Sequence, residues 1–248
     1  MSANKRFEGK TVIVTGAGSG IGKATAARLI NEGCSVVATD VSEDRLEEFK
    51  AEFPSADLKT VTGDISDDAV IQQIVGAADS PIDGLVNNAG IMDGFLPNAE
   101  VDDATWERVM AVNVTAVMKL TRAVLPIMIE HGSGSIVNVA SEAATRLAGG
   151  ISYTTSKYAV VGMTKNNAAF YSRKGVRTNA VLPGGVITNI EAPFKSEYAA
   201  EVLKGAFQVT PPPASPEQLA AAITWLLSDD SLNVSGAIMT SDGGWSTL

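Results

Sequence analysis

Cysteine and histidine are nearly absent from this chain, whose 248 residues include one of each, Cys34 and His131. A single cysteine cannot form an internal disulfide, so we expect a protein of a reducing compartment, the cytoplasm, with Cys34 as a small buried residue at the start of a strand. Because one histidine and one cysteine cannot form a ligand cluster and the acidic residues are scattered, we predict no metal site. A hydrolase is also excluded, since the serines at 133 and 135 lack the G-x-S-x-G spacing of a nucleophile elbow.

Positive charge is scarce as well, with 19 lysines and arginines against 28 acidic residues and a formal net charge of -9. A nucleic-acid groove and an anionic membrane surface both need clustered cations, so the sequence favours a small neutral substrate as partner. The first ten residues carry charges but no apolar core, and we expect no signal peptide there. The most apolar stretch, residues 109–129, is interrupted by Lys119 and Arg122, which argues against a membrane span.

What the chain does contain is a regular alternation of short β-branched runs and longer helical patterns, typical of parallel strands joined by crossover helices. Most of the runs are continuously apolar, as expected for strands covered on both faces. We therefore predict one α/β domain over residues 1–248, with a doubly wound, seven-stranded parallel sheet flanked by helices on both faces. The expected strands are residues 11–15, 36–40, 58–62, 84–87, 135–139, 178–182 and 237–240. The expected helices are residues 21–31, 43–53, 67–77, 105–130, 153–173 and 216–228.

Local signals support the boundaries of several helices. Ser42, Asp102 and Ser215 stand where an N-cap is needed, and Pro216 follows at a favourable first position. The segment 64–83 is short, so the helix before the fourth strand should be trimmed. Residues 184–213 read as irregular and end in three prolines. Because ligands of such sheets bind beyond the carboxyl ends of the strands, we interpret residues 185–213 as a substrate lid.

A glycine-rich loop follows the first strand, spaced Gly16-x-x-x-Gly20-x-Gly22, and a helix begins within it. Such a loop lets the backbone approach a pyrophosphate, whose charge faces free N–H groups at the helix start, as in Rossmann-like folds. The second strand ends at Asp40, whose carboxylate can accept hydrogen bonds from the ribose hydroxyls of NAD and would repel the extra phosphate of NADP. No lysine or arginine lies in the loop or directly after Asp40, so we expect NAD as the cofactor.

Further motifs follow later strands: Asn87-Asn88-Ala89-Gly90 after the fourth, Ser141 after the fifth, and then the pair Tyr153 and Lys157. Together with the glycine loop, in this order, they resemble the short-chain dehydrogenase/reductase family, in its single-domain form of about 250 residues. The resemblance covers nearly the whole chain. It includes Asn113, Pro183-Gly184, Thr188 and Asp242-Gly243-Gly244.

The resemblance implies a catalytic set of Asn113, Ser141, Tyr153 and Lys157. The spacing of the last two supports it independently, because residues four apart share one face of a helix. A phenol with a pKa near 10 needs a value nearer 7 to exchange protons at neutral pH, so the site must supply about 4 kcal/mol in favour of phenolate. Lys157 is the expected source, aided by the positive charge of the oxidised nicotinamide.

In the implied reaction, Tyr153 takes the proton of a secondary alcohol while the cofactor accepts hydride, and the reverse direction reduces a ketone. Ser141 would hold the substrate oxygen, Lys157 would bind the nicotinamide ribose, and Asn113 would hold a water of a proton relay. By position, the resemblance also assigns cofactor contacts to Gly16, Ser19, Gly20, Ile21, Gly22, Asp40, Asp64, Ile65, Asn88, Ala89, Gly90, Tyr153, Lys157, Pro183, Gly184, Val186 and Thr188. For Asp64, which follows Gly63, a turn role stays open.

Substrate choice should be set by Met92 and Asp93, by residues 142–151 and by the lid up to about Phe207. The acidic residues among them, Asp93, Glu142 and Glu191, favour a polyol, sugar or neutral cyclic compound over an anionic one. Position 140 is alanine where the family often has a second serine, and Ser141 is followed by the charged Glu142, so the hydrogen bonding on the substrate side departs from the usual pattern.

The long helices 105–130 and 153–173 are apolar around much of their circumference, and family members commonly pair them between subunits, so we predict a homotetramer. Two other functions stay open: a non-catalytic dinucleotide-binding sensor or scaffold on the same fold, and an NAD-assisted lyase or epimerase.

Overall fold

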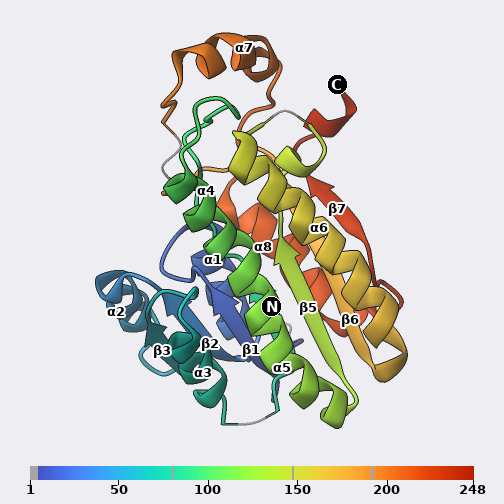
Figure 1. Ribbon diagram of the computed structural model, residues 1–248. Coiled ribbons are helices and arrows are strands. Elements are labelled where there is room, and N and C mark those ends of the chain that lie inside the picture. The colour runs from blue at the N-terminus through green and yellow to red at the C-terminus, as the bar shows by residue number, and fades with distance from the viewer. Residues whose placement is uncertain (1–4, 80, 147, 191–192) are drawn as a thin grey trace.

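The structure is a computed structural model that describes residues 5–79, 81–146, 148–190 and 193–248. Its centre is one parallel sheet of seven strands in the order β3-β2-β1-β4-β5-β6-β7 (Figure 1). Strands β1 to β3 are added to the sheet in one direction and β4 to β7 in the other. The boundary between β1 and β4 is therefore the topological switch point of doubly wound folds. The strands are β1 Thr11–Thr15, β2 Ser35–Asp40, β3 Leu58–Thr62, β4 Gly84–Asn87, β5 Gly134–Val139, β6 Val176–Pro183 and β7 Ile238–Ser241. The predicted fold class is confirmed.

The four central strands, β1, β4, β5 and β6, are buried at every residue, whereas the edge strands β3 and β7 are partly exposed. Successive residues of a strand point to opposite faces. In β1, Val12 and Val14 enter the core on one side of the sheet, and Ile13 enters the core on the other. Continuous apolar runs are therefore what this sheet requires.

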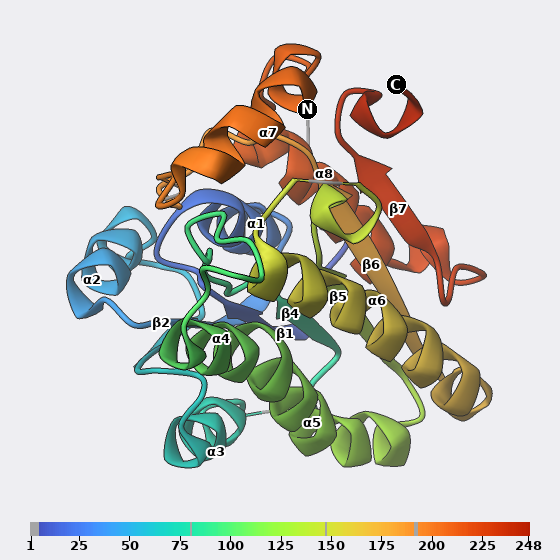
Figure 2. The same cartoon turned by 45° about the horizontal axis from the view of Figure 1, so that its top comes forward.

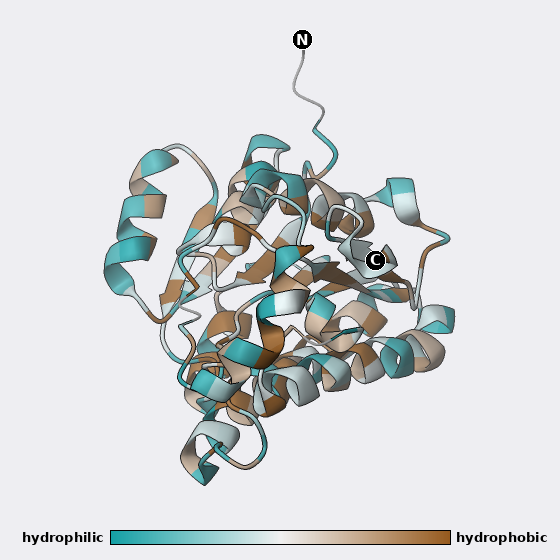
Figure 3. Cartoon of the chain, turned by 90° about the horizontal axis from the view of Figure 1, so that it is seen from above, coloured by the Kyte–Doolittle hydropathy of each residue, from teal (hydrophilic) through white to brown (hydrophobic). Residues whose placement is uncertain are grey.

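Helices cover both faces of the sheet (Figure 2). One face carries α1 Gly20–Asn31, α2 Glu43–Glu52 and α8 Pro216–Leu227. The other carries α3 Asp68–Gly76, α4 Asp103–Met110, α5 Val117–His131 and α6 Ile151–Tyr171. Viewed from above, apolar stretches lie between the layers and polar turns face outward (Figure 3). The expected caps are present: Ser42 accepts from Arg45 N–H, Asp102 accepts from Thr105 N–H, and Ser215 forms a capping box.

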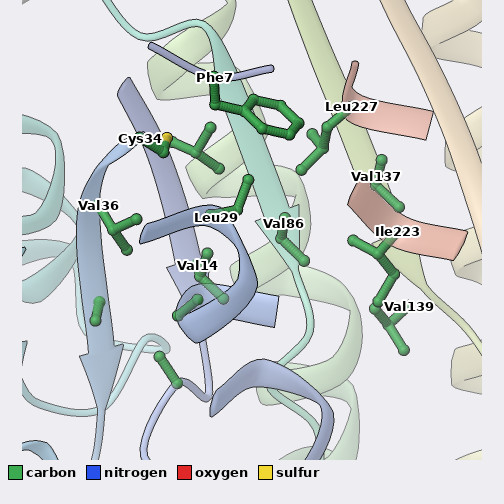
Figure 4. Close-up of a cluster of buried hydrophobic side chains, with 14 of the residues drawn as sticks. Phe7, Val14, Leu29, Cys34, Val36, Val86, Val137, Val139, Ile223 and Leu227 are labelled. Carbon is green, nitrogen blue, oxygen red and sulfur yellow. The ribbon is translucent and has the colours of Figure 1, made fainter. Parts of the chain in front are cut away.

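The core beneath α1 and α8 joins residues distant in sequence (Figure 4). Phe7, before the first strand, is fully buried in the same cluster as Leu29 of α1 and Ile223 and Leu227 of α8. Cys34 lies in this cluster, and burial raises the pKa of its thiol to about 12. A thiol with so little thiolate is a poor nucleophile, which agrees with the structural role expected for Cys34.

Two segments differ from the sequence prediction. Residues 105–130 are not one α-helix, because a π-helical stretch, Ala111–Ala116, separates α4 from α5. Residues 184–213 are not wholly irregular, because they contain α7, Glu197–Gln208, which stands apart above the sheet (Figure 1). Ser196 caps α7 by accepting from Ala199 N–H. The sequence prediction missed this helix start because the prolines nearby favoured an irregular segment.

By length and composition, the continuous helical stretch Asp103–His131 is apolar enough to cross a membrane. Half of its most apolar window is buried inside the protein, however, as in the core helix of a soluble fold. Leu120, Val124 and Met128 of this stretch pack in the core between α5 and the sheet.

Candidate active site

A cleft of about 540 Å³ opens at the carboxyl ends of the strands, on both sides of the switch point between β1 and β4. Its size suits a small molecule or cofactor. It is lined by every residue predicted for catalysis or cofactor binding except Gly22 and Asn113. These lining residues are Gly16, Ser19, Gly20, Ile21, Asp40, Asp64, Ile65, Asn88, Ala89, Gly90, Ser141, Tyr153, Lys157, Pro183, Gly184, Val186 and Thr188.

The glycine loop makes close backbone contacts that side chains would prevent. A Cβ on Gly22 would lie 2.1 Å from the backbone oxygen of Gly16, so the start of α1 rests directly on the loop. Gly16 and Gly20 have φ of 65° and 52°, in the left-handed region that favours glycine. A Cβ on Gly20 would meet Thr188, in the segment after β6, at 2.9 Å. The loop therefore offers free N–H groups at a helix start in the arrangement that a pyrophosphate needs.

The segment after β4 is fixed to this loop through Thr15. The Thr15 hydroxyl accepts hydrogen bonds from the N–H groups of Asn88 and Ala89, both at 3.0 Å, and Asn88 Nδ2 donates to the Thr15 carbonyl at 2.9 Å. The preceding Asn87 is buried and donates to Asn138 of β5 at 2.8 Å. Asn87 thus ties the strands together, and Asn88 to Gly90 form the cleft floor.

At the end of the cleft beside β2, Asp40 is almost fully buried, and both of its carboxylate oxygens accept hydrogen bonds. Oδ2 accepts from Gly18 N–H at 3.0 Å, and Oδ1 accepts from Ser42 N–H at 3.0 Å and from Arg45 Nη2 at 2.6 Å. The sequence prediction missed Arg45. Because α2 begins three residues after Asp40, its first turn brings Arg45 back over the carboxylate and into the cleft wall.

Asp64 and Ile65 line the same end of the cleft. Asp64 Oδ1 accepts from the N–H and hydroxyl of Ser66, and Oδ2 lies 2.7 Å from Arg108 of α4. Burial opposes ionisation of Asp64, but the hydrogen bonds from Ser66 and Arg108 outweigh it and lower the pKa. Asp64 therefore serves the turn and also lines the cleft. Arg108 is a second cleft cation that the sequence prediction missed.

At the opposite end of the cleft, α6 presents Tyr153 and Lys157 from one face. Lys157 Nζ lies 5.3 Å from the centre of the Tyr153 ring and donates to the Val139 carbonyl at 3.1 Å. Desolvation lowers the pKa of Lys157 to about 8. Ser141, at the start of a 3-10 turn after β5, accepts from Ala143 N–H at 3.1 Å, and its interaction with the Tyr153 side chain acts to lower the pKa of the phenol.

The pKa of Tyr153 is raised, opposite to the direction expected from the sequence. Burial of the phenol is the main cause, the interaction with Ser141 lowers the pKa, and the negative charge of Asp93 raises it further. Because the pKa of Tyr153 lies above the ordinary phenol value, the phenol stays protonated at neutral pH in the chain alone. That form is the proton donor needed to reduce a ketone.

Asn113 is buried in the π-helical stretch, underneath the cleft floor. Its Oδ1 accepts from Ile91 N–H at 2.9 Å, and its Nδ2 donates to the Ile91 carbonyl at 3.0 Å and to Ser156 at 3.1 Å. A Cβ on Gly90 would meet Asn113 Oδ1 and Lys157 Nζ, each at 3.4 Å. Asn113 therefore holds the floor against α6, close to Lys157. A π-bulge at such a place is typical of functional sites.

The cleft is also lined by Ile91, Met92, Val186, Asn189 and Ile190. The expectation of an acidic lining is wrong for Asp93 and Glu142, which are 1% and 0% exposed and do not line the cleft. The Asp93 carboxylate accepts hydrogen bonds from backbone N–H groups. Glu142 accepts from the Thr145 hydroxyl and faces Arg146. Glu191 lies outside the described residues.

Comparisons with known proteins agree with this geometry. A family model described as short chain dehydrogenase matches residues 10–199. 3beta-Hydroxysteroid dehydrogenase 2 of Eggerthella lenta is 38% identical, over 98% of this chain and 97% of its own length. The crystal structure of levodione reductase superposes with a TM-score of 0.89 at 36% identity, covering 98% of this chain and 99% of that one. A solved structure from Beutenbergia cavernae, with NADP at low occupancy, superposes with a TM-score of 0.87 at 32% identity, covering 99% and 100%.

Proposed function

The chain belongs to the short-chain dehydrogenase/reductase family, and from that premise we propose that it is an NAD-dependent oxidoreductase that interconverts a secondary alcohol and its ketone. The observation that carries the proposal is the convergence of Tyr153, Lys157 and Ser141 on the cleft that the glycine loop enters. A nicotinamide cofactor bound there would supply or accept the hydride.

The side chains have distinct tasks in this proposal. Tyr153 gives its proton to the ketone oxygen during reduction and takes it back during alcohol oxidation. Ser141, which lines the cleft together with the phenol, donates to the substrate oxygen and stabilises the charge that develops on it. The Lys157 ammonium binds the ribose hydroxyls and favours ionisation of the phenol. Asn113 fixes the floor beside Lys157, and its part in a proton relay stays a prediction.

We favour NAD over NADP because the Asp40 carboxylate lies where the adenosine ribose would bind. The preference should be limited, because Arg45 pairs with Asp40 at 2.6 Å and offsets part of its charge. Arg45 also lines the cleft, and its Nε is buried without a hydrogen-bond partner among the described residues. A phosphate on the ribose would therefore meet one negative and one positive group.

For the substrate, we favour a neutral cyclic alcohol or ketone over a polyol or sugar. Ile91, Met92, Val186 and Ile190 give the cleft an apolar portion, beside which lie the polar side chains of Thr188 and Asn189. These four apolar side chains offer no hydrogen-bond partners to the additional hydroxyls of a polyol, which disfavours its binding against them. A relative named for hydroxysteroids, which are polycyclic alcohols, points in the same direction.

The test is an absorbance screen at the reduced-nicotinamide band, with NAD and NADP against cyclic secondary alcohols, polyols, sugars and carboxylated alcohols. We expect catalytic turnover with cyclic alcohols and a higher specificity constant with NAD. Tyr153→Phe should abolish turnover and leave the NAD dissociation constant nearly unchanged. Reduction of no more than one equivalent of cofactor would instead support a sensor or an NAD-assisted lyase or epimerase. A highest specificity constant for a carboxylated substrate would contradict the substrate class.

We also propose that the whole chain acts as one domain, with residues 185–213 as a lid over the substrate. A short parallel bridge joins the two ends of this segment, since Ala214 N–H donates to the Gly185 carbonyl and Ile187 N–H donates to that of Ala214. The lid carries exposed Ile187 and Ile190, which a cyclic substrate would cover.

The assembly we propose is a cytoplasmic homotetramer. Large apolar side chains remain exposed on α5 and α6, with Met118, Tyr158 and Phe170 exposed by 40%, 52% and 66%. Pairing these helices across two-fold axes would bury them. Sedimentation at micromolar concentration should give four times the chain mass, and a monomer mass would reject the assembly.

A further inference from the structure

Helix α6, which carries Tyr153 and Lys157, lacks a cap of its own. Its N-cap residue is Gly150, which has no side chain to accept the free N–H groups, and its first turn holds no acidic residue. The first turn of a helix leaves several N–H groups unpaired. These groups need a partner from elsewhere in the fold, because the helix start is buried.

That partner is Asp93, which follows β4 and is 1% exposed. Oδ2 accepts from Tyr153 N–H at 2.9 Å, and Oδ1 accepts from Gly150 N–H at 3.2 Å and from Phe95 N–H at 3.0 Å. The Leu96 carbonyl accepts from Ile151 N–H at 2.9 Å. A Cβ on Gly150 would lie 2.4 Å from Asp93 Oδ2, so only glycine permits this approach.

The loop that carries Asp93 is held in a strained shape. Phe95 has φ of 59°, and it is the one non-glycine residue with positive φ among the described residues. Such a conformation costs on the order of 1–3 kcal/mol and persists only where its surroundings fix it. The Phe95 ring stacks on Phe194 of the lid with centroids 4.3 Å apart and meets Phe207 of α7 edge-on at 5.9 Å. The Gly94 carbonyl accepts from Lys195 N–H at 2.9 Å.

We propose that Asp93 is a positioning residue for Tyr153, because its carboxylate anchors the first turn of α6 and holds a buried negative charge beside the phenol. The inference rests on the proposed function for its kinetic consequence, but its structural and spectroscopic consequences are independent of it. Asp93 needs no contact with substrate in this role. The lid, through Phe194 and Lys195, holds the loop in the shape that brings Asp93 to the helix.

The charge has a definite effect on proton transfer. The titratable groups placed against Tyr153 are Asp93, from the loop after β4, and Lys157, one turn further along α6, while the neighbouring Ser141 is neutral. Asp93 raises the pKa of the phenol, so removing its charge must lower that pKa. In alcohol oxidation, where phenolate is the reactive form, the rise of kcat with pH should then occur at lower pH.

The experiment compares wild type with Asp93→Asn, which keeps the side-chain volume but removes the charge. We expect kcat to fall by about 10- to 100-fold through misplacement of the phenol, with the KM for NAD unchanged and the midpoint of the kcat–pH profile shifted to lower pH. Asp102→Asn is the matched control, because Asp102 also caps a helix, α4, by accepting from a backbone N–H at 2.6 Å. The Asp102→Asn protein should lose a little stability and keep the wild-type kcat–pH profile.

Two measurements do not depend on turnover. The tyrosinate absorbance of each protein, minus that of its own Tyr153→Phe counterpart, follows one phenol of the four tyrosines, and it should titrate at lower pH in Asp93→Asn. Amide hydrogen exchange in the first turn of α6 should be faster in Asp93→Asn than in wild type. A folded Asp93→Asn protein with unchanged titration, exchange and kcat would overturn the proposal. An inactive wild type would refute the proposed function alone, since titration and exchange would still decide the role of Asp93.

Discussion

Replacing Lys157 with methionine tests the electrostatics of the site through the stability of the protein. The ammonium is buried, and desolvation lowers its pKa from 10.5 to about 8. Between these values the unfolded chain binds one proton more than the native chain. The free energy of unfolding therefore rises with pH across this window, and the penalty of the buried charge is fully present below it.

The magnitude follows from the size of the window. Each pKa unit corresponds to about 1.4 kcal/mol, so Lys157 should contribute a rise of about 3 kcal/mol between about pH 8 and pH 10.5. Lys157→Met lacks the titrating group and should not show this rise. Subtracting the variant from wild type removes the contributions of all other groups, provided that they titrate alike in both proteins.

The assay is guanidinium unfolding without cofactor, followed by circular dichroism at several pH values from about 7 to about 10. Lys165→Met is the matched control, because Lys165 lies exposed two turns further along α6. We expect the wild-type minus Lys157→Met difference to grow with pH, and the wild-type minus Lys165→Met difference to stay flat. A flat difference for Lys157 as well would refute the idea that the site holds a desolvated ammonium. Lys157→Met should also lose turnover, because the phenol loses its cation.

Three further changes have defined outcomes. Gly22→Ala should weaken NAD binding and cost about 1–3 kcal/mol of stability, because its Cβ would lie 2.1 Å from a backbone oxygen. Gly76→Ala should do neither, because no atom lies within 4 Å of a Cβ at that position. Equal NAD dissociation constants for wild type and Gly22→Ala would contradict this. Asp40→Asn should raise the specificity constant with NADP relative to that with NAD, and Arg45→Ala should lower this ratio, because each variant removes one partner of the same ion pair. A shift of the ratio in the same direction for both variants would show that the pair does not govern the choice between NAD and NADP. Glu142→Gln should stabilise the protein at neutral pH, since burial raises the pKa of this carboxyl, and its advantage in thermal unfolding should disappear as the pH falls towards the ordinary glutamate range.

The sequence by itself determined the sheet and most of the residues that gather at its carboxyl edge. Buried parallel strands must be continuously apolar, so the run at β1 could be located to the residue. The glycine loop could be assigned because few side chains tolerate its close contacts, and Tyr153 and Lys157 because a helix brings residues four apart to one face. These features depend on local geometry.

Only the tertiary structure decided the contacts that join distant segments. Asp93 caps a helix that begins almost sixty residues later, and no spacing rule connects the two. The same holds for Phe95, whose ring reaches the lid. Arg45 could be overlooked because its contact with Asp40 depends on how α2 turns back after β2. The direction of the Tyr153 pKa shift depends on burial and on the charge of Asp93, which follow from how the whole chain packs around the phenol.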